Sequence, residues 1–419
     1  MSQTSLPNNW KRAQLKDACA GEPQNGAFIK NPEFGSGLPF VNVKDIYRGI
    51  VVDLKAVERL QCDEVSARRY ALKEDDILFV RSSLKRDGIG QCCVVRGIRE
   101  TAIYDCHLIR ISPDKAKADA LFLGYYFLSS RGKEDLIARS KTTTMTTINQ
   151  QTLIETELVL PPTAEQRAIA HALRAVQEAG EARRKELQLE RERKAALMQH
   201  LFTHGTRGES RKPTEIGEMP ESWRVSKLGE VAKIERGKFA HRPRNDPAFY
   251  GGDIPFIQTG DVTAANGYIR TYSQTLNEVG LSVSRMFPKG TIVITIAANI
   301  GYTGILEFDS AFPDSLIAIS PFENVDSKYL NYYLSTQQPE MDRKAPQGTQ
   351  KNINIEFLLP WPVIQPSKSE QVAIANILSA CDSKLVALQK ESALLDELFR
   401  AMLEELMTGR LSTLPLIED

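Results

Sequence analysis

The sequence predicts an α/β protein with an internal pseudo-twofold repeat, in which two mixed α/β domains are joined by two long antiparallel coiled-coil helices. Three observations predict this fold. The string "TAEQRAIAHAL" at Thr163 returns as "KSEQVAIANIL" at Lys368, 205 residues later. Short β-branched runs bounded by Gly, Pro and Asp precede each string, as is typical of strands. Apolar residues then recur at alternating steps of four and three, which is the spacing of a coiled-coil seam.

The composition limits the class of protein. A chain of 419 residues with 42% hydrophobic content can bury a substantial core in two or three domains. Lys+Arg and Asp+Glu number 53 each, so a site for a polyanion must be a local patch. The six cysteines form no C-x-x-C pair, which indicates a reducing compartment. The first residues lack an apolar signal core and no uninterrupted apolar run approaches ~20 residues, so we expect a cytoplasmic protein with no membrane partner.

The repeat extends beyond the two helix starts. The offset between matched residues drifts in the front part of each unit, but stays at 205 from Ile148 to Leu201. A variable globular part is therefore followed by a helical part of fixed length. The matched strings include "LPFVNVKDI" at Leu38 with "IPFIQTGDV" at Ile254, "YDCHLIRISP" at Tyr104 with "FPDSLIAISP" at Phe312, and "TTINQQTL" at Thr146 with "KNINIEFL" at Lys351. "DDILFVRSSLKRDGIGQCCVV" at Asp75 corresponds to "GTIVITIAANIGYTGIL" at Gly290, with four extra residues in the first copy.

We divide the chain into four parts: a globular domain over 1–160, a helix region over 161–210, a second globular domain over 211–365 and a second helix region over 366–419. Apolar runs such as "DILFV" and "TIVITI" predict strands, whereas "ALFLGYYFLSS" and "SKYLNYYLSTQ" have helical spacing. Gly205 and Gly409 are expected to end the long helices, each about 40 residues or ~60 Å long.

The seam predicts that the two helices pack on each other, because a single amphipathic helix of this length would leave its apolar stripe in water. The first helix fills the seam less well, with Gly180, Arg183, Glu190 and Lys194 at seam positions. The alternative is that each helix folds back on its own domain. The predicted seam residues are Ile169, Leu173, Val176, Leu187, Leu197, Leu201, Ile374, Leu378, Leu385, Leu388, Leu395, Phe399, Met402 and Leu406.

These strings together resemble the specificity (S) subunit of type I restriction-modification systems. The resemblance covers nearly the whole chain and rests on "PPTAEQRAIAHAL" and "QPSKSEQVAIANIL", on "PNNW" and "PESW" at the start of the two units, and on "QGTQKNIN". It implies two target-recognition domains, each reading one half of a split double-stranded DNA target, with the helices setting the unread spacer. It also implies two methyltransferase partner subunits, which methylate adenine with S-adenosylmethionine, and motor-nuclease subunits for cleavage. No cofactor is expected in this chain.

Local polar and basic loops at matched positions support DNA binding, because Lys and Arg neutralise phosphates while Asn, Gln, Ser and Thr can reach base edges. Ordinary solvated loops would have the same composition. Asp45 and Asp261 are expected to cap short turns. The candidate contacts are Asn42, Lys44, Arg81, Ser82, Ser83, Lys85, Arg86, Lys141, Thr142, Thr143, Thr144, Thr146, Arg236, Lys238, Arg242, Arg244, Gln258, Thr259, Asn299, Gln347, Thr349, Gln350 and Lys351.

Other functions have weaker support in the sequence. "NPEF" at Asn31 and "DPAF" at Asp246 each lack the second proline of an adenine-methyltransferase loop, and neither a P-loop nor a nuclease site is evident. We expect no catalytic residue and no metal site: the histidines show no ligand spacing, and Cys106 and His107 would point to opposite faces of a strand. Four tyrosines at helical spacing are expected in the core, namely Tyr125, Tyr126, Tyr332 and Tyr333. A coiled-coil adaptor without a DNA role is the alternative function, and the helix segment "EARRKELQLERERK" is a candidate surface for partners.

Overall fold

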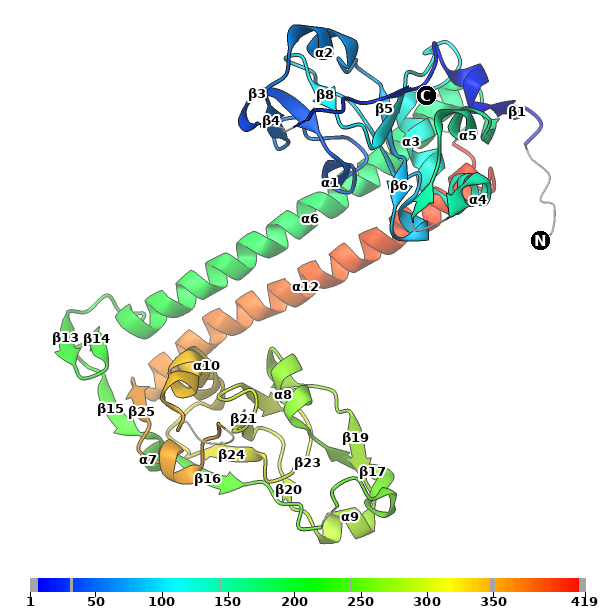
Figure 1. The fold of residues 1–419 in the computed structure, drawn as a ribbon. Coiled ribbons are helices and arrows are strands. Elements are labelled where there is room, and N and C mark those ends of the chain that lie inside the picture. The colour runs from blue at the N-terminus through cyan, green and yellow to red at the C-terminus, as the bar shows by residue number, and fades with distance from the viewer. Residues whose placement is uncertain (1–6, 31–32, 143–144, 242, 347–350, 414–419) are drawn as a thin grey trace. The chain divides into compact units, whose positions relative to one another are not determined.

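The computed structural model describes residues 7–30, 33–142, 145–241, 243–346 and 351–413 (Figure 1). The chain divides into two compact units. The first unit combines Met1–Lys185 with Gln389–Asp419, and the second unit is Glu186–Leu388. Both boundaries fall inside the long helices α6 (Thr163–His204) and α12 (Lys368–Met407). Each unit therefore contains one globular domain, the start of one long helix and the end of the other.

The globular domain of the first unit is built from short strands and helices. They are β1 (Lys11–Gln14), η1 (Leu15–Ala18), β2 (Gln24–Asn25), β3 (Phe34–Val41), α1 (Val43–Ile46), β4 (Glu58–Leu60), α2 (Glu64–Arg69), β5 (Ile77–Val80), β6 (Ser82–Ser83), η2 (Arg86–Gly88), β7 (Cys92–Val94), β8 (Ile103–Tyr104), β9 (Leu108–Ile111), α3 (Ala120–Leu128), α4 (Ser130–Arg139), β10 (Lys141–Thr142), β11 (Thr146–Thr147), α5 (Gln150–Ile154) and β12 (Glu157–Leu160).

The globular domain of the second unit is likewise built from short strands and helices. They are β13 (Arg211–Thr214), β14 (Gly217–Pro220), β15 (Arg224–Lys227), α7 (Leu228–Val231), β16 (Ala232–Arg236), η3 (Pro247–Phe249), β17 (Tyr250–Phe256), α8 (Thr259–Ala264), β18 (Gly267–Ile269), β19 (Gln274–Leu276), α9 (Glu278–Ser282), β20 (Met286–Phe287), β21 (Ile292–Thr295), β22 (Thr303–Leu306), β23 (Ser310–Ala311), β24 (Leu316–Pro321), α10 (Ser327–Lys344), α11 (Ile355–Leu358) and β25 (Pro362–Gln365).

Strand pairing shows that the sequence repeat is a repeat of topology. The sheet β2-β9-β5-β7 of the first unit corresponds to β16-β24-β21-β22 of the second, which β18 extends. The sheet β4-β3-β8 corresponds to β19-β17-β23, and in both units the middle strand pairs in parallel with the last one. The antiparallel pair β1-β12 corresponds to β15-β25. Central strands β5 and β21 are fully buried, as their unbroken apolar sequences predict.

A glycine in each unit allows the same close approach of two backbone segments. A Cβ on Gly26 would lie 2.3 Å from the carbonyl oxygens of Tyr104 and Asp105, and a Cβ on Gly237 would lie 2.2 Å from the Pro313 oxygen. No side chain fits at such distances, so only glycine permits this packing. Gly26 directly follows β2 and Gly237 directly follows β16, and these two strands occupy matching places in the two sheets.

The Glu-Gln strings that begin the two long helices have a structural role. The side chain of Gln166 accepts a hydrogen bond from Asp119 N (2.8 Å) and donates one to the Pro161 oxygen (2.9 Å). In the second unit Gln371 accepts from Asp326 N (2.8 Å) and donates to the Pro366 oxygen (3.0 Å). Because Asp119 and Asp326 cap α3 and α10, each glutamine fixes a long helix to the buried helix of its own domain.

The long helices run antiparallel within each unit. In the first unit Ile169 and Leu173 of α6 share a core with Leu403 and Leu406 of α12, and nearer the middle Arg183 pairs with Glu391 at 2.9 Å. In the second unit Leu201 shares a core with Ile374 and Leu378, while Lys384 lies 3.4 Å from Glu190. The alternative that each helix folds back on its own domain is therefore wrong.

The predicted seam residues are all buried or half-buried. Of the polar seam positions in α6, Gly180 and Glu190 are buried, Lys194 is half-buried and Arg183 is exposed. Glu190 is held by Arg193 and Lys384, which lower its pKa through hydrogen bonds, with Arg193 the larger influence. These ionic contacts occur where apolar residues are missing from the seam of the first helix.

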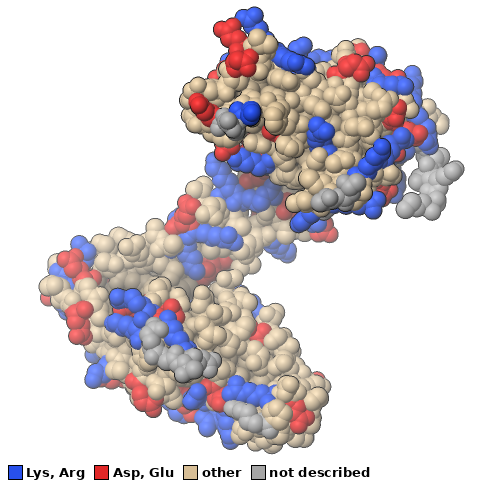
Figure 2. Space-filling model, viewed as in Figure 1, with Lys and Arg blue, Asp and Glu red and all other residues tan. Residues whose placement is uncertain are grey.

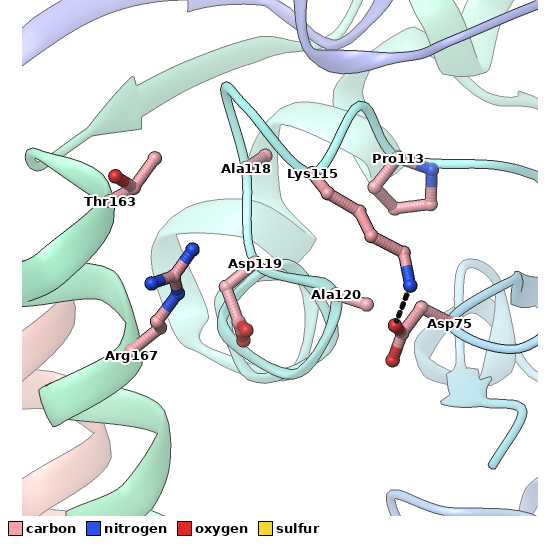
Figure 3. A pocket seen from close by; sticks show the side chains of 8 residues that line it. All are labelled: Asp75, Pro113, Lys115, Ala118, Asp119, Ala120, Thr163 and Arg167. Atoms are coloured by element: carbon pink, nitrogen blue, oxygen red, sulfur yellow. Dashed lines mark ion pairs between the residues drawn. The ribbon is translucent and has the colours of Figure 1, made fainter.

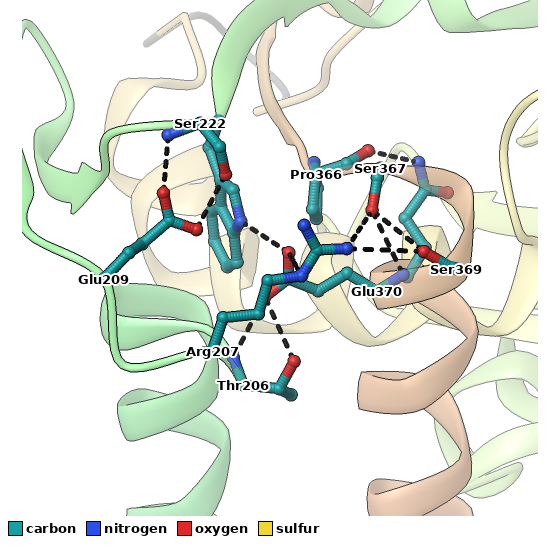
Figure 4. Close-up of polar contacts among 10 residues, drawn as sticks. Thr206, Arg207, Glu209, Ser222, Pro366, Ser367, Ser369 and Glu370 are labelled. Atoms are coloured by element: carbon teal, nitrogen blue, oxygen red, sulfur yellow. Dashed lines mark hydrogen bonds and ion pairs between the residues drawn. The ribbon is translucent and has the colours of Figure 1, made fainter.

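A buried carboxylate closes the second unit where α6 ends and α12 begins (Figure 4). Glu370 is 2% exposed and accepts hydrogen bonds from Trp223 Nε1 (3.1 Å), Thr206 N (3.0 Å) and Thr206 Oγ1 (3.1 Å). Arg207 lies 3.5 Å away as its counterion. Gly205 ends α6 with a positive φ beside this cluster, as Gly409 does after α12 in the first unit.

The matching place in the first unit is less completely paired. Among the described residues, the carboxylate of Glu165 accepts one hydrogen bond, from Asn9 Nδ2 at 3.1 Å. The indole nitrogen of Trp10, the counterpart of Trp223, is buried without a hydrogen-bond partner in the described part of the chain. The two copies therefore share the fold of this junction but not its polar contacts.

One stretch of α12 is unusually apolar. By length and composition alone, a window of this helix with mean hydropathy 1.2 could cross a membrane, and 33% of that window is buried inside the protein. The seam supplies part of this hydropathy, and exposed residues such as Ile377 and Val386 supply more.

We expect Glu370→Ala to lower the free energy of unfolding by roughly 2–4 kcal/mol, because Trp223 Nε1 and the Arg207 guanidinium lose a buried acceptor. Urea unfolding at constant pH measures the change. Glu165→Ala is the matched control and should cost about 1 kcal/mol, since that carboxylate has fewer donors. An equal or larger loss for Glu165→Ala would contradict the assignment.

Candidate nucleic-acid interface

Two polar segments far apart in the sequence meet in a small sheet of the first unit. Strands β10, β11 and β6 pair in that order, with Thr146 opposite both Thr142 and Ser83. Thr142 is exposed, and Ser82 and Ser83 are half-buried. Thr146 is buried, with its hydroxyl 3.2 Å from Thr142 Oγ1. The structure thus brings together the serine and threonine side chains of both predicted loops.

The hairpin between β5 and β7 carries exposed cations next to this sheet. Its tip follows β6, and its base is closed by hydrogen bonds from Gly90 N to the Val80 oxygen and from Val80 N to the Gln91 oxygen. Lys85 and Arg86 at the tip are exposed, as is Lys141 on β10. Within the described residues none of these three cations has an ion-pair partner, so their charges are available to a phosphate.

Three other candidates in the first unit make contacts within the protein. The Arg81 guanidinium donates to the Cys106 oxygen at 3.4 Å. Asn42 caps α1 in a capping box with Asp45, as expected for that aspartate. Lys44 forms an ion pair with Glu58 at 2.8 Å. These contacts hold the loops in place, and they compete with binding to DNA.

The basic segment of the second unit surrounds the turn that contains Asp314. Arg236 donates to the Asp314 oxygen at 2.7 Å, and Arg244 forms an ion pair with its carboxylate. Lys238 is exposed, with its backbone N–H bonded to the Phe312 oxygen at 3.0 Å. The charge of Arg244 is thus partly neutralised by an acidic residue that the sequence pattern did not pair with it.

The remaining candidates of the second unit lie on two other surfaces. Asn299 is exposed at the hairpin between β21 and β22, and Lys351 pairs with Asp342 at 2.9 Å. Gln258 precedes α8 and donates to Gln274 at 3.0 Å, and Thr259 begins that helix. Asp261 caps α8, as predicted. The candidates outside the described residues are Thr143, Thr144, Arg242, Gln347, Thr349 and Gln350.

The four helical tyrosines belong to the core, which confirms their expected role. Tyr125, Tyr126, Tyr332 and Tyr333 are all nearly inaccessible. Burial raises the pKa of each hydroxyl, so these groups stay protonated at neutral pH. They do not form a stacking surface for bases.

The expectation that Cys106 and His107 point to opposite faces is wrong. Residues 105–107 form a turn rather than a continuous strand, so Cys106 Sγ lies 3.6 Å from His107 Nδ1. With Asp105 they form a group whose ligand atoms lie within 4.8 Å of one another. Burial and the charge of Asp105 raise the pKa of the Cys106 thiol, and the Asp105 carboxylate already accepts from His107 N and Nδ1 at 2.8 and 2.7 Å. The geometry is that of a hydrogen-bonded turn.

The histidine spacing also differs from the expectation. His200 and His204 are one helical turn apart in α6, and their rings stack with centroids 4.5 Å apart. A spacing of four residues places two imidazoles on one helix face, which is a pattern that metal ligands can use. This spacing of four residues is already present in the sequence, contrary to the expectation that the histidines show none.

A pocket of about 180 Å³ lies beside the start of α6 in the first unit (Figure 3). Its acidic groups have structural partners: Asp75 pairs with Lys115 at 2.7 Å and with Arg96 at 3.0 Å, and Asp119 caps α3. Burial acts to raise the pKa of Asp75, but these two cations together lower it. Of the lining residues, Arg167 points toward the pocket from α6. Both acidic groups of the lining thus take part in structural contacts.

Charge on the visible face of each globular part occurs in separate patches (Figure 2). Lysines and arginines gather in small groups among neutral and acidic side chains on this face. Attraction for a polyanion is therefore local to loops such as the hairpin tip after β6.

Comparison with known proteins gives a consistent result. The family model of the type I restriction modification DNA specificity domain matches twice, over residues 7–191 and 220–398. A Methanocaldococcus jannaschii protein assigned as the MjaX type I restriction enzyme specificity subunit is 27% identical over 414 residues, covering 97% of this chain and 94% of the relative. The MjaVIII specificity subunit of the same organism is 25% identical over 425 residues, with the same coverage of both chains.

Solved structures share the fold. The HsdS subunit of Thermoanaerobacter tengcongensis has a TM-score of 0.53 at 20% identity, over 98% of this chain and 99% of that chain. The type I S subunit of M. genitalium has a TM-score of 0.59 at 16% identity, over 96% of this chain and 98% of that chain. The likeness extends over both globular domains and both long helices.

We expect each of Lys85→Gln, Arg86→Gln and Lys141→Gln to reduce the slope of log Kobs against log salt for double-stranded DNA by about 0.9, because each removes one phosphate contact. Fluorescence anisotropy across a salt series measures this slope. Lys44→Gln is the matched control, since Lys44 is already paired with Glu58. An unchanged slope in a variant that combines all three substitutions would show that these cations do not contact DNA.

Proposed function

The chain belongs to the type I restriction modification DNA specificity family, and we propose that each of its globular domains reads one half of a split DNA target. It is the DNA-specificity subunit of a type I restriction-modification complex. The subunit is not itself catalytic. Methylation and cleavage are carried out by the partner subunits with which members of this family assemble on DNA.

The proposal that each domain reads one half of the target rests on one observation: the two globular domains share a topology but differ in their loops. The sheets of the two units correspond strand by strand. Their exposed tips do not: the hairpin after β5 presents Ser82, Ser83, Lys85 and Arg86, whereas the one after β21 presents Asn299. Similar scaffolds with different side chains at the tips are suited to binding different sequences, because base edges are read by such side chains.

The long helices are proposed to set the length of the unread spacer. Helices α6 and α12 have 42 and 40 residues and pair through a seam that continues over both. A single inserted residue would rotate the following part of a helix by about 100 degrees and break the seam. The fixed offset of 205 residues between the two helical parts agrees with this requirement.

We propose that two methyltransferase subunits dock on the outer side of the helices. Part of the candidate segment "EARRKELQLERERK" is used within the helix pair, since Arg183, Arg184 and Lys194 form ion pairs with α12. Helix α12 offers a different surface. Its exposed large apolar side chains are Val372, Ile377, Val386, Leu394 and Leu398. Apolar side chains exposed along one helix are typical of a binding surface.

Further properties of the complex remain proposals. S-adenosylmethionine is expected in the partner methyltransferase, adenine is expected to be the methylated base, and the complex is expected in the cytoplasm, where motor-nuclease subunits would join it for cleavage. A solved chain with a TM-score of 0.59 at 20% identity is described in work on complex assembly and conformational transition of the type I R-M system. The alternative of an adaptor without DNA reading has no observation in its favour, because the specificity-domain matches cover both globular domains.

Co-expression with a type I methyltransferase subunit in a methylation-free host should produce methylated adenines in one split motif. Sequencing that detects methylated bases across the genome measures this and supplies the target. Omission of this chain is the control and should abolish the signal. A stable complex that binds S-adenosylmethionine but leaves the genome unmethylated would contradict the proposed function.

Inserting one heptad next to Leu187 in α6 and another next to Leu388 in α12 keeps the seam in phase and adds about 10 Å of helix. The same methylation assay should then report both half-sequences unchanged, with a spacer longer by about three base pairs at 3.4 Å each. A heptad in α6 alone is the control and should abolish activity by disrupting the seam. An unchanged spacer in the double insertion would show that the helices do not set it.

A further inference from the structure

We propose that the hairpin tip Ser83–Arg86 enters the major groove of one half-site and that Leu84 packs against the 5-methyl group of a thymine there. The proposal rests on the proposed function and names a base that the first unit reads. It concerns a residue that sequence reasoning passed over, because Leu84 is the single apolar residue between Ser83 and Lys85 in an otherwise polar loop.

The first observation is exposure at a polar tip. The Leu84 residue is 80% exposed and lies directly between Ser83 of β6 and the cations Lys85 and Arg86. Isolated apolar side chains on a protein surface are ordinary. This one differs because the side chains beside it already have the composition of a DNA contact. Burying it against a ligand would therefore accompany phosphate binding by its neighbours.

The second observation is that the tip is held in one conformation by its own hydrogen bonds. Lys85 N donates to Ser83 Oγ at 3.2 Å, and Gly88 N donates to the Lys85 oxygen at 3.0 Å. The Tyr47 hydroxyl braces the far side of the tip by donating to the Gly88 oxygen at 3.3 Å. Ordering a loop costs conformational entropy on binding, and these contacts reduce that cost before DNA arrives.

The third observation is the shape of the support. The tip extends from a three-stranded sheet of two-residue strands, β10-β11-β6, which Figure 1 shows at the edge of the first globular domain. The major groove of B-DNA is about 12 Å wide and admits a β-ribbon, whereas the minor groove is about 6 Å wide. The only apolar group that base edges display in the major groove is the thymine methyl. A leucine carried into that groove therefore favours an A·T pair.

The feature is confined to one copy. The corresponding hairpin of the second unit is four residues shorter, and its Ile300 aligns with Ile89, which is buried like Ile300, so no residue there corresponds to Leu84. Its exposed tip consists of Ala298 and Asn299. The thymine contact is thus expected in one half-site only, which makes the other half-site an internal control on the same DNA molecule.

The test is a double-mutant cycle on the complex of this chain with its methyltransferase partner and the target found by methylation mapping. Each thymine in both half-sites is replaced in turn by deoxyuridine, which removes the methyl group and keeps the hydrogen-bonding edge. With the wild-type chain, one such replacement should weaken binding about four-fold. Leu84→Ala should weaken binding to the unmodified target by a similar factor, but cause no further loss on the deoxyuridine target.

Val65→Ala is the matched control, because Val65 is 75% exposed on α2 of the same domain and is not part of the hairpin. It should bind both targets as the wild type does. The proposal would be overturned if Leu84→Ala weakened binding equally on the unmodified and the deoxyuridine targets. It would also be overturned if no deoxyuridine replacement weakened binding of the wild type, or if either half-site lacked an A·T pair to serve as the contact or as the control. Specific binding of the wild type to the unmodified target separates these results from a failure of the proposed function.

Discussion

Each globular domain completes its hydrophobic core with the ends of both long helices. In the first unit Leu403, Leu406 and Met407 from the end of α12 belong to the same cluster as the strands of the first domain. In the second unit Leu201 and Phe202 from the end of α6 have the same role. A long amphipathic helix is only marginally stable by itself in water. Helices and domains therefore stabilise one another, and the compact units cut across the repeat in the sequence.

The polar contacts at the helix starts explain why the same short strings occur twice. Gln166 and Gln371 satisfy buried backbone groups with matching hydrogen bonds, and an unpaired buried group of that kind would be costly. The neighbouring glutamates are less alike. Glu370 has Trp223, Thr206 and Arg207 around it, whereas Trp10 near Glu165 keeps an unpaired indole nitrogen. Glutamate and glutamine both recur in the two strings, but only the glutamine keeps the same hydrogen-bond partners in both units.

Periodic features were predictable from the sequence, while contacts between distant residues were not. The seam, the terminal glycines, the buried tyrosines and the capping aspartates follow from spacing and from local backbone chemistry. The small sheet that joins Ser83 to Thr146 has two-residue strands, which carry almost no pattern. The ion-pair partners of Arg244 and Lys44 depend on how loops fold over one another. Composition alone therefore did not indicate that the charges of these two side chains are already paired. The turn at Cys106 was missed because its neighbours on both sides are strands.

The hairpins that bear the candidate contacts are closed below their tips by paired backbone groups. In the first unit the closure joins Val80 to Gly90 and Gln91, and in the second it joins Thr295 to Gly301 and Tyr302. Beyond the closure, Ser82 and Ser83 of the first unit pair with β11, whereas Ala298 and Asn299 of the second unit belong to no strand. The number and identity of residues in this segment can therefore differ while the strands beneath keep their partners. The four-residue difference between the two copies is one such change. A protein built this way can acquire new recognition properties by exchanging short surface segments, with little selective cost in folding.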